Sequence, residues 1–500
     1  MTSINSKRKP IALNAENLRL LGGAVRIPGY ERIGLPQNIL HIGVGGFHRA
    51  HQAAYLDDLL RRPGFTSWGL CGIALLPQDK RIYETMQRQD CLYTLVERDN
   101  EGDRPRILGS IGNILFAPDD PQGVIEKMAA PETRIVSMTI TEGGYYISQE
   151  NGEFDATHPD ILRDLAHPEA PACVFGYLAE ALALRRARGF GPFTLMSCDN
   201  IQSNGNVLKK MFLSYVRLRD VHLAGWIEKN GAFPNSMVDR ITPATKDEHI
   251  ELLRNDFGIE DGWPVVTEPF RQWVIEDTFC AGRPAWEDVG AQITADVLPY
   301  EKMKIRLLNA SHQVLCYTGV LLGYEFVHQT MDDPLIRKLV EKTMDVEVTP
   351  LLAEVPGVDL NLYKRTLIER FSNPTIRDQL YRICEAGSVR IPKFVLPSMI
   401  EQLDAGGPIR LLAFTVASWI RYMSGKDENG RTISINDPLE SRVRDRLVTS
   451  GADPRSVLSL REIFGGILPE SKRFIEAVSR AYRSLVEKGG HAALKEYTAD

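Results

Sequence analysis

Short apolar runs that end in glycine or polar residues recur through the first 200 residues of the chain. Each run has the length and composition of a buried strand, and a helical pattern follows the first of them. The runs are Asn38 to Val44, Trp68 to Leu76, Arg134 to Thr141 and Phe193 to Cys198. Strands that alternate with helices form parallel sheets, so we predict an α/β fold whose N-terminal part is a Rossmann-like, doubly wound sheet.

The pattern changes near Tyr300, beyond which apolar residues recur with the 3.6-residue period of helices. Because 500 residues exceed what one hydrophobic core usually serves, two domains are expected. We predict a Rossmann-type domain over residues 1–295 and a mainly α-helical domain over residues 296–500. The candidate helices of the second domain are Lys304 to Gly323, Asp333 to Leu352, Pro374 to Ala386, Pro397 to Leu403, Gly407 to Met423 and Glu470 to Lys488.

The charge pattern favours a small-molecule partner. The formal net charge is −6 and no long basic run occurs, so the chain has no electrostatic footprint for nucleic acid or an anionic membrane. The stretch from Met1 to Asn14 carries basic residues without an apolar segment after them, and the densest apolar stretch, Leu411 to Ile420, is too short to span a bilayer. We expect a cytoplasmic protein.

Seven cysteines are scattered singly, with no CxxC pair. This argues against a disulfide framework and a zinc ribbon, and it fits a reducing compartment. The ten histidines form no HExxH or HxH pattern. We therefore expect no metal held by protein ligands.

A glycine-rich turn, GVGGF, follows the first apolar run. Glycines between a strand and a helix let backbone amides approach the pyrophosphate of a dinucleotide, so we assign Gly43, Gly45, Gly46 and Phe47 to cofactor binding. The GxGxxG fingerprint has glycine where this chain has His48. The alternative, a turn that serves only to reverse the chain, stays open.

Asp79 follows the second apolar run and is the candidate contact for an adenosine ribose. A carboxylate at this place bonds the ribose hydroxyls and repels a 2′-phosphate, so NAD is favoured over NADP. Because Asp79 lies just after a proline, a helix N-cap is the alternative interpretation.

Lys304, Asn309 and His312 lie in one stretch of helical pattern. At 100° per residue, Asn309 is about 140° and His312 about 80° around the helix from Lys304, so the three share one sector. Apolar residues fall in the same sector and indicate that it faces the interior. Polar side chains there need partners or a ligand.

These residue types suit the transfer of a hydride from an alcohol. Oxidation requires a base for the hydroxyl proton, and Lys304 fills that role once burial or a cationic neighbour lowers its pKa from ~10.4 toward ~7 to 8. The Asn309 amide is a neutral donor for the developing alkoxide. The alternatives are a solvated helix lysine and core polar groups that bond to loops.

The chain resembles the polyol-specific long-chain dehydrogenases, the mannitol dehydrogenase family, over nearly its whole length. The motifs that carry the resemblance are HIGVGGFHRAHQA at residues 41–53, TEGGY at 141–145, SCDNIQSNG at 197–205, PNSMVDRITPAT at 234–245, KxxxxNxxH at 304–312 and RFSNPTIRDQLYRI at 370–383. Several long motifs in one order argue against chance similarity.

The resemblance implies a metal-independent, NAD-dependent polyol dehydrogenase that is a monomer. Lys304 would be the general base, Asn200 and Asn309 would form the oxyanion hole, and His312 would orient the substrate. Asn200 also follows a predicted strand, where a residue facing the nicotinamide belongs, although an ordinary turn is the alternative.

Other candidate residues follow from the same resemblance. Asp239, Arg382 and Arg390 would contact the substrate, and an ion pair between Asp239 and its neighbouring arginine is the alternative for the first. Glu142 and Glu301 are candidates for relaying the proton to solvent, and simple surface positions are the alternative for both.

The implied reaction is the NAD-dependent interconversion of D-mannitol and D-fructose. The same chemistry on D-arabinitol, D-sorbitol or the hexuronates fructuronate and tagaturonate stays open, and a hexuronate would require a bidentate arginine such as Arg382 or Arg390. A non-catalytic NAD-binding sensor is the alternative from another class. The presence of Lys304, Asn309, His312 and Asn200 argues against it, because a sensor has no need of a base.

Overall fold

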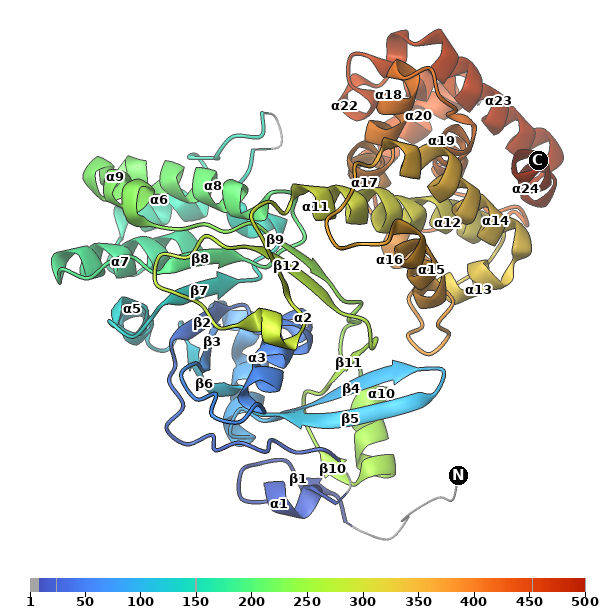
Figure 1. Ribbon diagram of the computed structural model, residues 1–500. Helices are drawn as coiled ribbons and strands as arrows, with labels where there is room; N and C mark the ends of the chain where they lie inside the picture. The colour runs from blue at the N-terminus through green and yellow to red at the C-terminus, as the bar shows by residue number, and fades with distance from the viewer. Residues whose placement is uncertain (1–8, 24, 149–150, 452, 500) are drawn as a thin grey trace. The chain divides into compact units, whose positions relative to one another are not determined.

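The computed structural model describes residues 9–23, 25–148, 151–451 and 453–499. Residues 1–8, which hold most of the basic N-terminal stretch considered above, lie outside the described residues. The chain divides into two compact units, Met1–Val297 and Leu298–Asp500 (Figure 1).

The centre of the first unit is a five-stranded parallel sheet with the order β6-β3-β2-β7-β8. Its strands are β2 (Ile39–Ile42), β3 (Leu70–Ala74), β6 (Ile111–Phe116), β7 (Ile135–Met138) and β8 (Thr194–Ser197). The chain runs from β2 to one edge and then from β7 to the other, so the strand order reverses between β2 and β7. The predicted doubly wound sheet is confirmed. Four of the strands fall in the predicted runs, whereas β6 was missed because Gly112 and Asn113 interrupt its apolar pattern.

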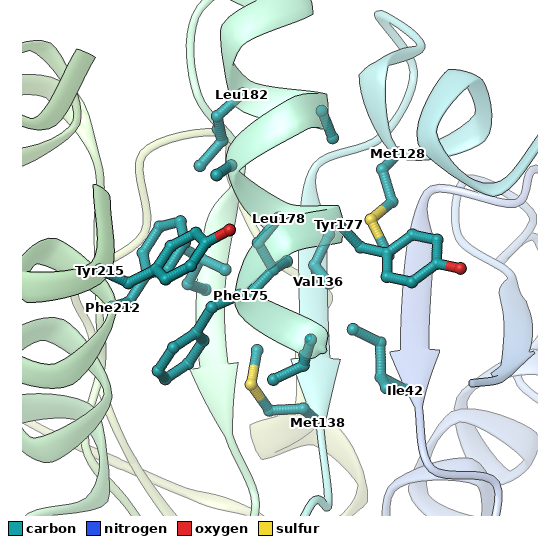
Figure 2. Close-up of a cluster of buried hydrophobic side chains, with 14 of the residues drawn as sticks. Ile42, Met128, Val136, Met138, Phe175, Tyr177, Leu178, Leu182, Phe212 and Tyr215 are labelled. Atoms are coloured by element: carbon teal, nitrogen blue, oxygen red, sulfur yellow. The ribbon is translucent and has the colours of Figure 1, made fainter. Parts of the chain in front are cut away.

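Alternate strand residues pack under helices on opposite faces of the sheet. Leu40, Val136 and Met138 belong to one hydrophobic core with α7 (Val174–Ala187), and Ile39 and Ile135 belong to another with α3 (Gln52–Leu60). Figure 2 shows Phe175, Leu178 and Leu182 of α7 beside Val136 and Met138. The other helices of this unit are α1 (Leu18–Leu21), α2 (Gly46–Ala50), α4 (Lys80–Arg88), α5 (Pro121–Ala129), α6 (Pro159–Ala166), α8 (Asn204–Arg219), α9 (Val221–Asn230) and α10 (Asp247–Leu252).

Three smaller sheets complete the first unit, and none of them was predicted. Their strands are short or carry charged residues along their length, so they lack the apolar runs of the central sheet. They are formed by β1 (Ile11–Ala12) with β10 (Ile259–Glu260), by β11 (Val265–Thr267) with β4 (Tyr93–Asp99) and β5 (Gly102–Leu108), and by β13 (Gln292–Thr294) with β12 (Gln272–Glu276) and β9 (Ser236–Asp239).

The second unit is mainly helical, as predicted. Its helices are α11 (Leu298–Lys304), α12 (Ala310–Leu321), α13 (Val327–Asp332), α14 (Pro334–Lys342), α15 (Leu360–Phe371), α16 (Leu380–Cys384), α17 (Gly387–Phe394), α18 (Leu396–Asp404), α19 (Arg410–Tyr422), α20 (Glu440–Thr449), α21 (Arg455–Leu458), α22 (Arg461–Phe464), α23 (Lys472–Lys488) and α24 (Gly490–Thr498). The apolar stretch Leu411 to Ile420 is the buried part of α19, which packs against α12 and α23. No helix in the described ranges has the length and apolar character needed to cross a membrane.

The prediction of one helix from Pro374 to Ala386 is largely wrong. Within that range only the five residues of α16 are helical. Asn373 Oδ1 accepts hydrogen bonds from the backbone N–H and the hydroxyl of Thr375, at 3.0 and 2.7 Å, and this closes a turn instead. Arg377 then has φ +48, a left-handed conformation that ends any helical run.

Candidate functional site

The glycine turn lies at the carboxyl end of β2, where the strand order reverses. Gly43 has φ +90, and a Cβ there would lie 2.3 Å from the carbonyl oxygen of Thr139, so only glycine fits. A Cβ at Gly45 or Gly46 would meet no atom closer than 3.7 Å. The backbone of these two residues is therefore uncovered at the start of α2, where the first N–H groups have no partner within the helix. This arrangement suits the pyrophosphate of a dinucleotide.

His48 stands where the fingerprint has its third glycine. Its buried ring stacks on His41 of β2, with centroids 3.5 Å apart and planes 8° from parallel. That glycine normally allows a helix to approach the strand, and here two flat rings provide the contact. Burial lowers the pKa of His41 to about 3 and that of His48 well below its ordinary value, so both rings are neutral.

Phe47 and Asp79 flank this turn. The half-buried Phe47 ring stacks on His51, with centroids 4.9 Å apart. Asp79 follows β3, and its Oδ2 accepts the backbone N–H of Leu76 at 3.0 Å. Asp79 is thus the last residue of the short turn Pro77–Asp79 and bonds back to the residue before that turn, whereas its side chain makes no N-cap hydrogen bond at the start of α4. The carboxylate also stands beyond the carboxyl end of the second strand, as ribose binding requires.

Glu142 and Asn200 are exposed residues that follow β7 and β8. Glu142 begins a short 3-10 turn, Glu142–Tyr145. Because β7 and β8 are parallel neighbours, both loops leave the same edge of the sheet. The structure thus brings these two candidate residues to one edge.

Asn204 connects this edge to β9, the strand that ends in Asp239. Its amide Nδ2 donates to the carbonyl oxygens of Ser197 and Ser236, at 3.2 and 2.9 Å, and its Oδ1 accepts the N–H of Ser236 at 2.9 Å. Asp239 is buried at the end of β9. Arg240, the residue after it, pairs with Glu97 at 2.6 Å.

In the second unit, a π turn, Ile305–Asn309, separates α11 from α12. The N–H of Ala310 bonds to the carbonyl oxygen of Ile305, five residues earlier, where an α-helix would use four. Side chains five residues apart therefore stack along this turn, so Asn309 lies one turn from Lys304 on the same side of the helix. The angle of about 140° predicted from regular α-helical winding is wrong, because the π turn takes up one additional residue.

The candidate residues of this helix are largely buried. Lys304 is 6% exposed and Glu301 is 4% exposed. His312, three residues beyond Asn309, has its ring 4.6 Å from that of Phe371 in α15. Asn309 Oδ1 is buried and has no hydrogen-bond partner within the described part of the chain. Because an unsatisfied buried polar atom costs about 1–3 kcal/mol, this oxygen is suited to accept a hydrogen bond from a ligand hydroxyl.

Arg306 anchors the π turn to a neighbouring helix. Its guanidinium donates to Glu401 Oε1 at 2.9 Å and to the Ser398 hydroxyl at 2.5 Å, and both partners belong to α18. Arg306 is 7% exposed. The π turn is thereby fixed to a neighbouring helix by a buried, charge-assisted contact.

Arg382 and Arg390 lie close together around α16. Arg390 Nη1 donates to the carbonyl oxygens of Arg382 and Ile383, at 3.0 and 2.7 Å, and so caps the end of the helix. The exposed Arg382 pairs with both oxygens of Asp378 at 2.7 Å. A carboxylate on a substrate would have to compete with Asp378 for this guanidinium.

Asp199, Asn204 and Arg306 were not recognised from the sequence. The first two lie inside the SCDNIQSNG motif, so the motif was the available signal, but their bonding partners are distant in sequence. Among the residues that the structure describes, no three His, Cys, Asp or Glu side chains are grouped to hold a metal ion.

A glycine turn at the reversal point of a doubly wound sheet, followed by a helical unit that carries a buried lysine, an asparagine and a histidine, defines a two-domain dehydrogenase. Two family models match, the mannitol dehydrogenase Rossmann domain over residues 37–288 and the mannitol dehydrogenase C-terminal domain over residues 296–486. The chain belongs to the mannitol dehydrogenase family, as its motifs predicted.

Similar proteins match over nearly the full length. The mannitol 2-dehydrogenase of Phaeosphaeria nodorum is 47% identical over 490 residues, which cover 97% of this chain and 86% of that protein. The structure of Pseudomonas fluorescens mannitol 2-dehydrogenase in ternary complex with NAD and D-mannitol is 47% identical, with a TM-score of 0.87 and coverage of 97% and 99%. A substrate-free D-sorbitol dehydrogenase is 37% identical, with a TM-score of 0.90 and coverage of 96% and 100%.

Proposed function

We propose that this chain catalyses the NAD-dependent oxidation of D-mannitol to D-fructose and the reverse reduction. The observation that carries the proposal is the 47% identity, over 97% of the chain, to a mannitol 2-dehydrogenase whose structure contains NAD and D-mannitol. The cofactor is assigned to residues 1–295, and the helical residues 296–500 supply the base and further substrate contacts.

The residues around the glycine turn fit NAD. Gly45 and Gly46 leave space for the pyrophosphate, Gly43 gives the turn its shape, and Phe47 borders it. The Asp79 carboxylate is suited to the hydroxyls of the adenosine ribose. NAD, when bound, supplies the acceptor for the hydride that leaves the carbinol carbon.

Lys304 is the proposed base. Burial disfavours the ammonium form of a lysine, and a neutral Nζ accepts the proton of the reacting hydroxyl. The amides of Asn309 and Asn200 donate hydrogen bonds to the substrate oxygen as negative charge develops on it. Glu301 and Glu142 then pass the proton from Nζ to solvent. This mechanism needs no metal ion, because the lysine removes the proton and the amides stabilise the alkoxide.

The substrate is held by His312, Asp239, Arg382 and Arg390 in this proposal. A polyol offers only hydroxyl groups, which an aspartate, an imidazole and arginine N–H groups all bond. The pairing of Arg382 with Asp378 favours a neutral polyol over a hexuronate, since that guanidinium already has a carboxylate. D-sorbitol is the second candidate substrate because of the D-sorbitol dehydrogenase with the same fold, and D-arabinitol belongs in the same panel.

We also propose that the protein is a cytoplasmic monomer that binds no nucleic acid. The net charge of −6 without a long basic run supports the absence of nucleic-acid binding. Size-exclusion chromatography with light scattering measures the oligomeric state directly, and a dimer mass would contradict the monomer.

Replacement of the base tests the proposed function. Lys304→Ala is expected to lower mannitol oxidation by at least about 10³-fold while NADH still binds, because only proton removal is lost. NADH formation is followed by absorbance, and NADH binding by fluorescence titration. Lys302→Ala is the matched control, since Lys302 lies on the same helix and pairs with Glu401 at 3.2 Å. A Lys304→Ala variant that keeps most of its activity near neutral pH would refute the lysine mechanism.

Activity assays of the unmodified chain distinguish the proposed enzyme from a non-catalytic NAD-binding sensor. A panel of D-mannitol, D-sorbitol, D-arabinitol, D-fructose and fructuronate, each with NAD or NADP in the matching redox state, identifies the preferred pair. We expect D-mannitol with NAD to have the highest kcat/KM. No turnover with any member of the panel would favour a non-catalytic NAD-binding protein.

A further inference from the structure

One buried carboxylate joins the loops that follow β7 and β8. Asp199 Oδ1 accepts the backbone N–H of Thr141 at 2.9 Å, and its Oδ2 accepts the N–H of Ile140 at 3.1 Å and the hydroxyl of Tyr145 at 2.7 Å. Asp199 is 8% exposed and directly precedes Asn200. All three donors come from the loop that also carries the TEGGY motif.

Thr141 has a backbone conformation that L-residues rarely adopt, with φ 58 and ψ 175. For a β-branched residue a positive φ is an outlier, and it persists only where the surroundings enforce it. The bond from its N–H to Asp199 supplies such a constraint. Glu142 follows directly, so the course of the chain at Glu142 depends on this bond.

The loop after β8 is itself fixed on its other side. Asn204 Nδ2 donates to the carbonyl oxygens of Asp199 and Ser197, at 3.0 and 3.2 Å, and Asn204 is fully buried. Asp199 therefore extends from an anchored loop to a strained one. Its carboxylate is a rigid connection between them.

We propose that Asp199 is a positioning residue of the dehydrogenase, which sets the place of Asn200 and Glu142 by holding the two loops together. The inference rests on the proposed function, because the roles of Asn200 and Glu142 belong to that reaction. Asp199 acts through its neighbours and has no contact with the substrate in this scheme.

The number of donors explains why this residue is a carboxylate. Two N–H groups and one O–H group converge on its two oxygens, and a carboxylate is acceptor-only when ionised. An asparagine would offer one acceptor oxygen and would turn an NH2 group toward one of the donors. Burial raises the pKa of Asp199, and the bonds from Tyr145, Ile140 and Thr141 oppose that shift by stabilising the charged form.

Asp199→Asn is the first test. Stopped-flow measurement of NADH formation with D-mannitol is expected to show a rate constant for hydride transfer about 10- to 100-fold lower, as misplaced groups cause. The Kd for NADH should stay within about twofold of the unmodified value, which assigns the loss to the reaction step rather than to binding. An unchanged rate constant overturns the inference.

Thr141→Gly separates positioning from a general effect on stability. Glycine adopts a positive φ without strain, so a loop with glycine at 141 depends less on Asp199. In this background Asp199→Asn should lower the rate by a smaller factor than in the unmodified chain, a coupling that a double-mutant cycle measures. Equal factors in the two backgrounds overturn the inference.

Glu347→Gln is the matched control for the loss of a buried carboxylate. Glu347 is 1% exposed, and it accepts the N–H groups of Leu411 and Leu412 at 2.8 Å each. Burial raises its pKa, as it does for Asp199. Glu347 lies on neither loop, so this variant should lower Tm and leave the rate of hydride transfer unchanged. A rate as low as that of Asp199→Asn would show a general effect and overturn the inference.

Tyr145→Phe replaces the first test if Asp199→Asn does not fold. It keeps the ring and deletes the hydroxyl bonds to Asp199 at 2.7 Å and to Ser197 at 2.6 Å. The rate should fall severalfold with unchanged NADH affinity, and an unchanged rate overturns the inference. Failure of the proposed function is a different result, since the unmodified chain would then oxidise no polyol.

Discussion

The two units position their candidate reaction residues by different means. In the first unit, Glu142, Asn200 and Asp239 lie at or just after the ends of three separate strands. The Asp199 carboxylate connects the loops after β7 and β8, and Asn204 connects the loop after β8 to the start of β9 at Ser236. In the second unit, Lys304, Asn309 and His312 belong to one helix, and a π turn sets the first two side by side. The first arrangement depends on side-chain contacts between distant segments, and the second on the winding of one backbone segment.

The difference also affects how each set responds to mutation. Single side chains support the loops of the first unit, so one substitution can displace a loop. The helix of the second unit is supported by its own backbone bonds and by packing of α12 against α14, α16 and α19. Side-chain changes there should act mainly when they touch the π turn or the reacting groups themselves.

The largest expected effect on kcat comes from removal of the two candidate amide donors, one of which lies in each unit. Asn200→Ala and Asn309→Ala should each lower kcat for mannitol oxidation about 10²- to 10³-fold, as loss of one oxyanion donor does. If the amides act together on one oxygen, the double variant should lose less than the product of the two factors.

Asn206→Ala is the control for the first unit, because its side chain is exposed and only its backbone N–H bonds to Asn235. Full activity of Asn200→Ala beside an inactive Asn309→Ala would show that the loop after β8 does not contact the substrate oxygen.

Acid should weaken the first unit more than the second. Burial lowers the pKa of His41 and His51 to about 3, and that of His48 well below its ordinary value. The unfolded chain binds protons at these histidines near pH ~6.5, whereas His41 and His51 of the folded chain do not bind them until near pH 3. The free energy of unfolding therefore falls as pH is lowered through this window, by about 2 kcal/mol per histidine between pH ~7.5 and ~5.

Urea unfolding at the two pH values measures this effect. Five of the six tryptophans lie in the first unit, and Trp419 alone lies in the second. The acid shift of the midpoint should thus be larger by tryptophan fluorescence than by the helical circular dichroism signal. Equal shifts by both probes would contradict the assignment of the acid sensitivity to the first unit.

Loss of the anchor on the π turn should have a moderate effect. Arg306→Met removes the bonds to Glu401 and Ser398, and we expect kcat to fall about 10-fold because the spacing of Lys304 and Asn309 loosens. Lys302→Met is the control, since Lys302 also bonds Glu401 but precedes the π turn. Equal kcat values for both variants would mean that backbone packing alone maintains the π winding.

The smallest expected effect concerns the cofactor. Asp79→Ala should raise the ratio of kcat/KM for NADP to that for NAD about fivefold, the equivalent of about 1 kcal/mol of charge repulsion. Asp79→Asn is the matched control, because its side-chain oxygen still accepts the N–H of Leu76 while the charge is gone. Both variants should shift the ratio alike, and an unchanged ratio would reject the ribose assignment.

The central sheet could be predicted because its strands are buried on both faces and read as continuous apolar runs. Gly112 and Asn113 hid β6 for the same reason, since they break such a run. The π turn had no signal of its own. Lys304 and Asn309 are five residues apart in either winding, and the contact that Arg306 makes from the π turn is to Glu401, 95 residues away.

The candidate residues after β7 and β8 were identifiable from their motifs, but the contacts that hold them were not. The bond from Thr141 to Asp199 spans 58 residues, and no local pattern records it. The positive φ of Thr141 was equally hidden, because threonine is not a residue that such a conformation selects. Local spacing therefore predicted the candidate residues, whereas their placement depends on long-range contacts that the spacing does not record.

Because of the π turn, the winding of the helix from Leu298 to Leu321 affects both the proposed reaction and the packing of the core. Five residues separate Lys304 from Asn309, and regular α winding over them would rotate the rest of the helix by about 100° from its present course, a rotation that the π turn absorbs. With regular winding the apolar face of α12 would turn away from α19, so the π turn serves the spacing of the candidate residues and the packing of the core at once. Anyone who transfers this lysine, asparagine and histidine to a new scaffold has to transfer the irregular winding with them.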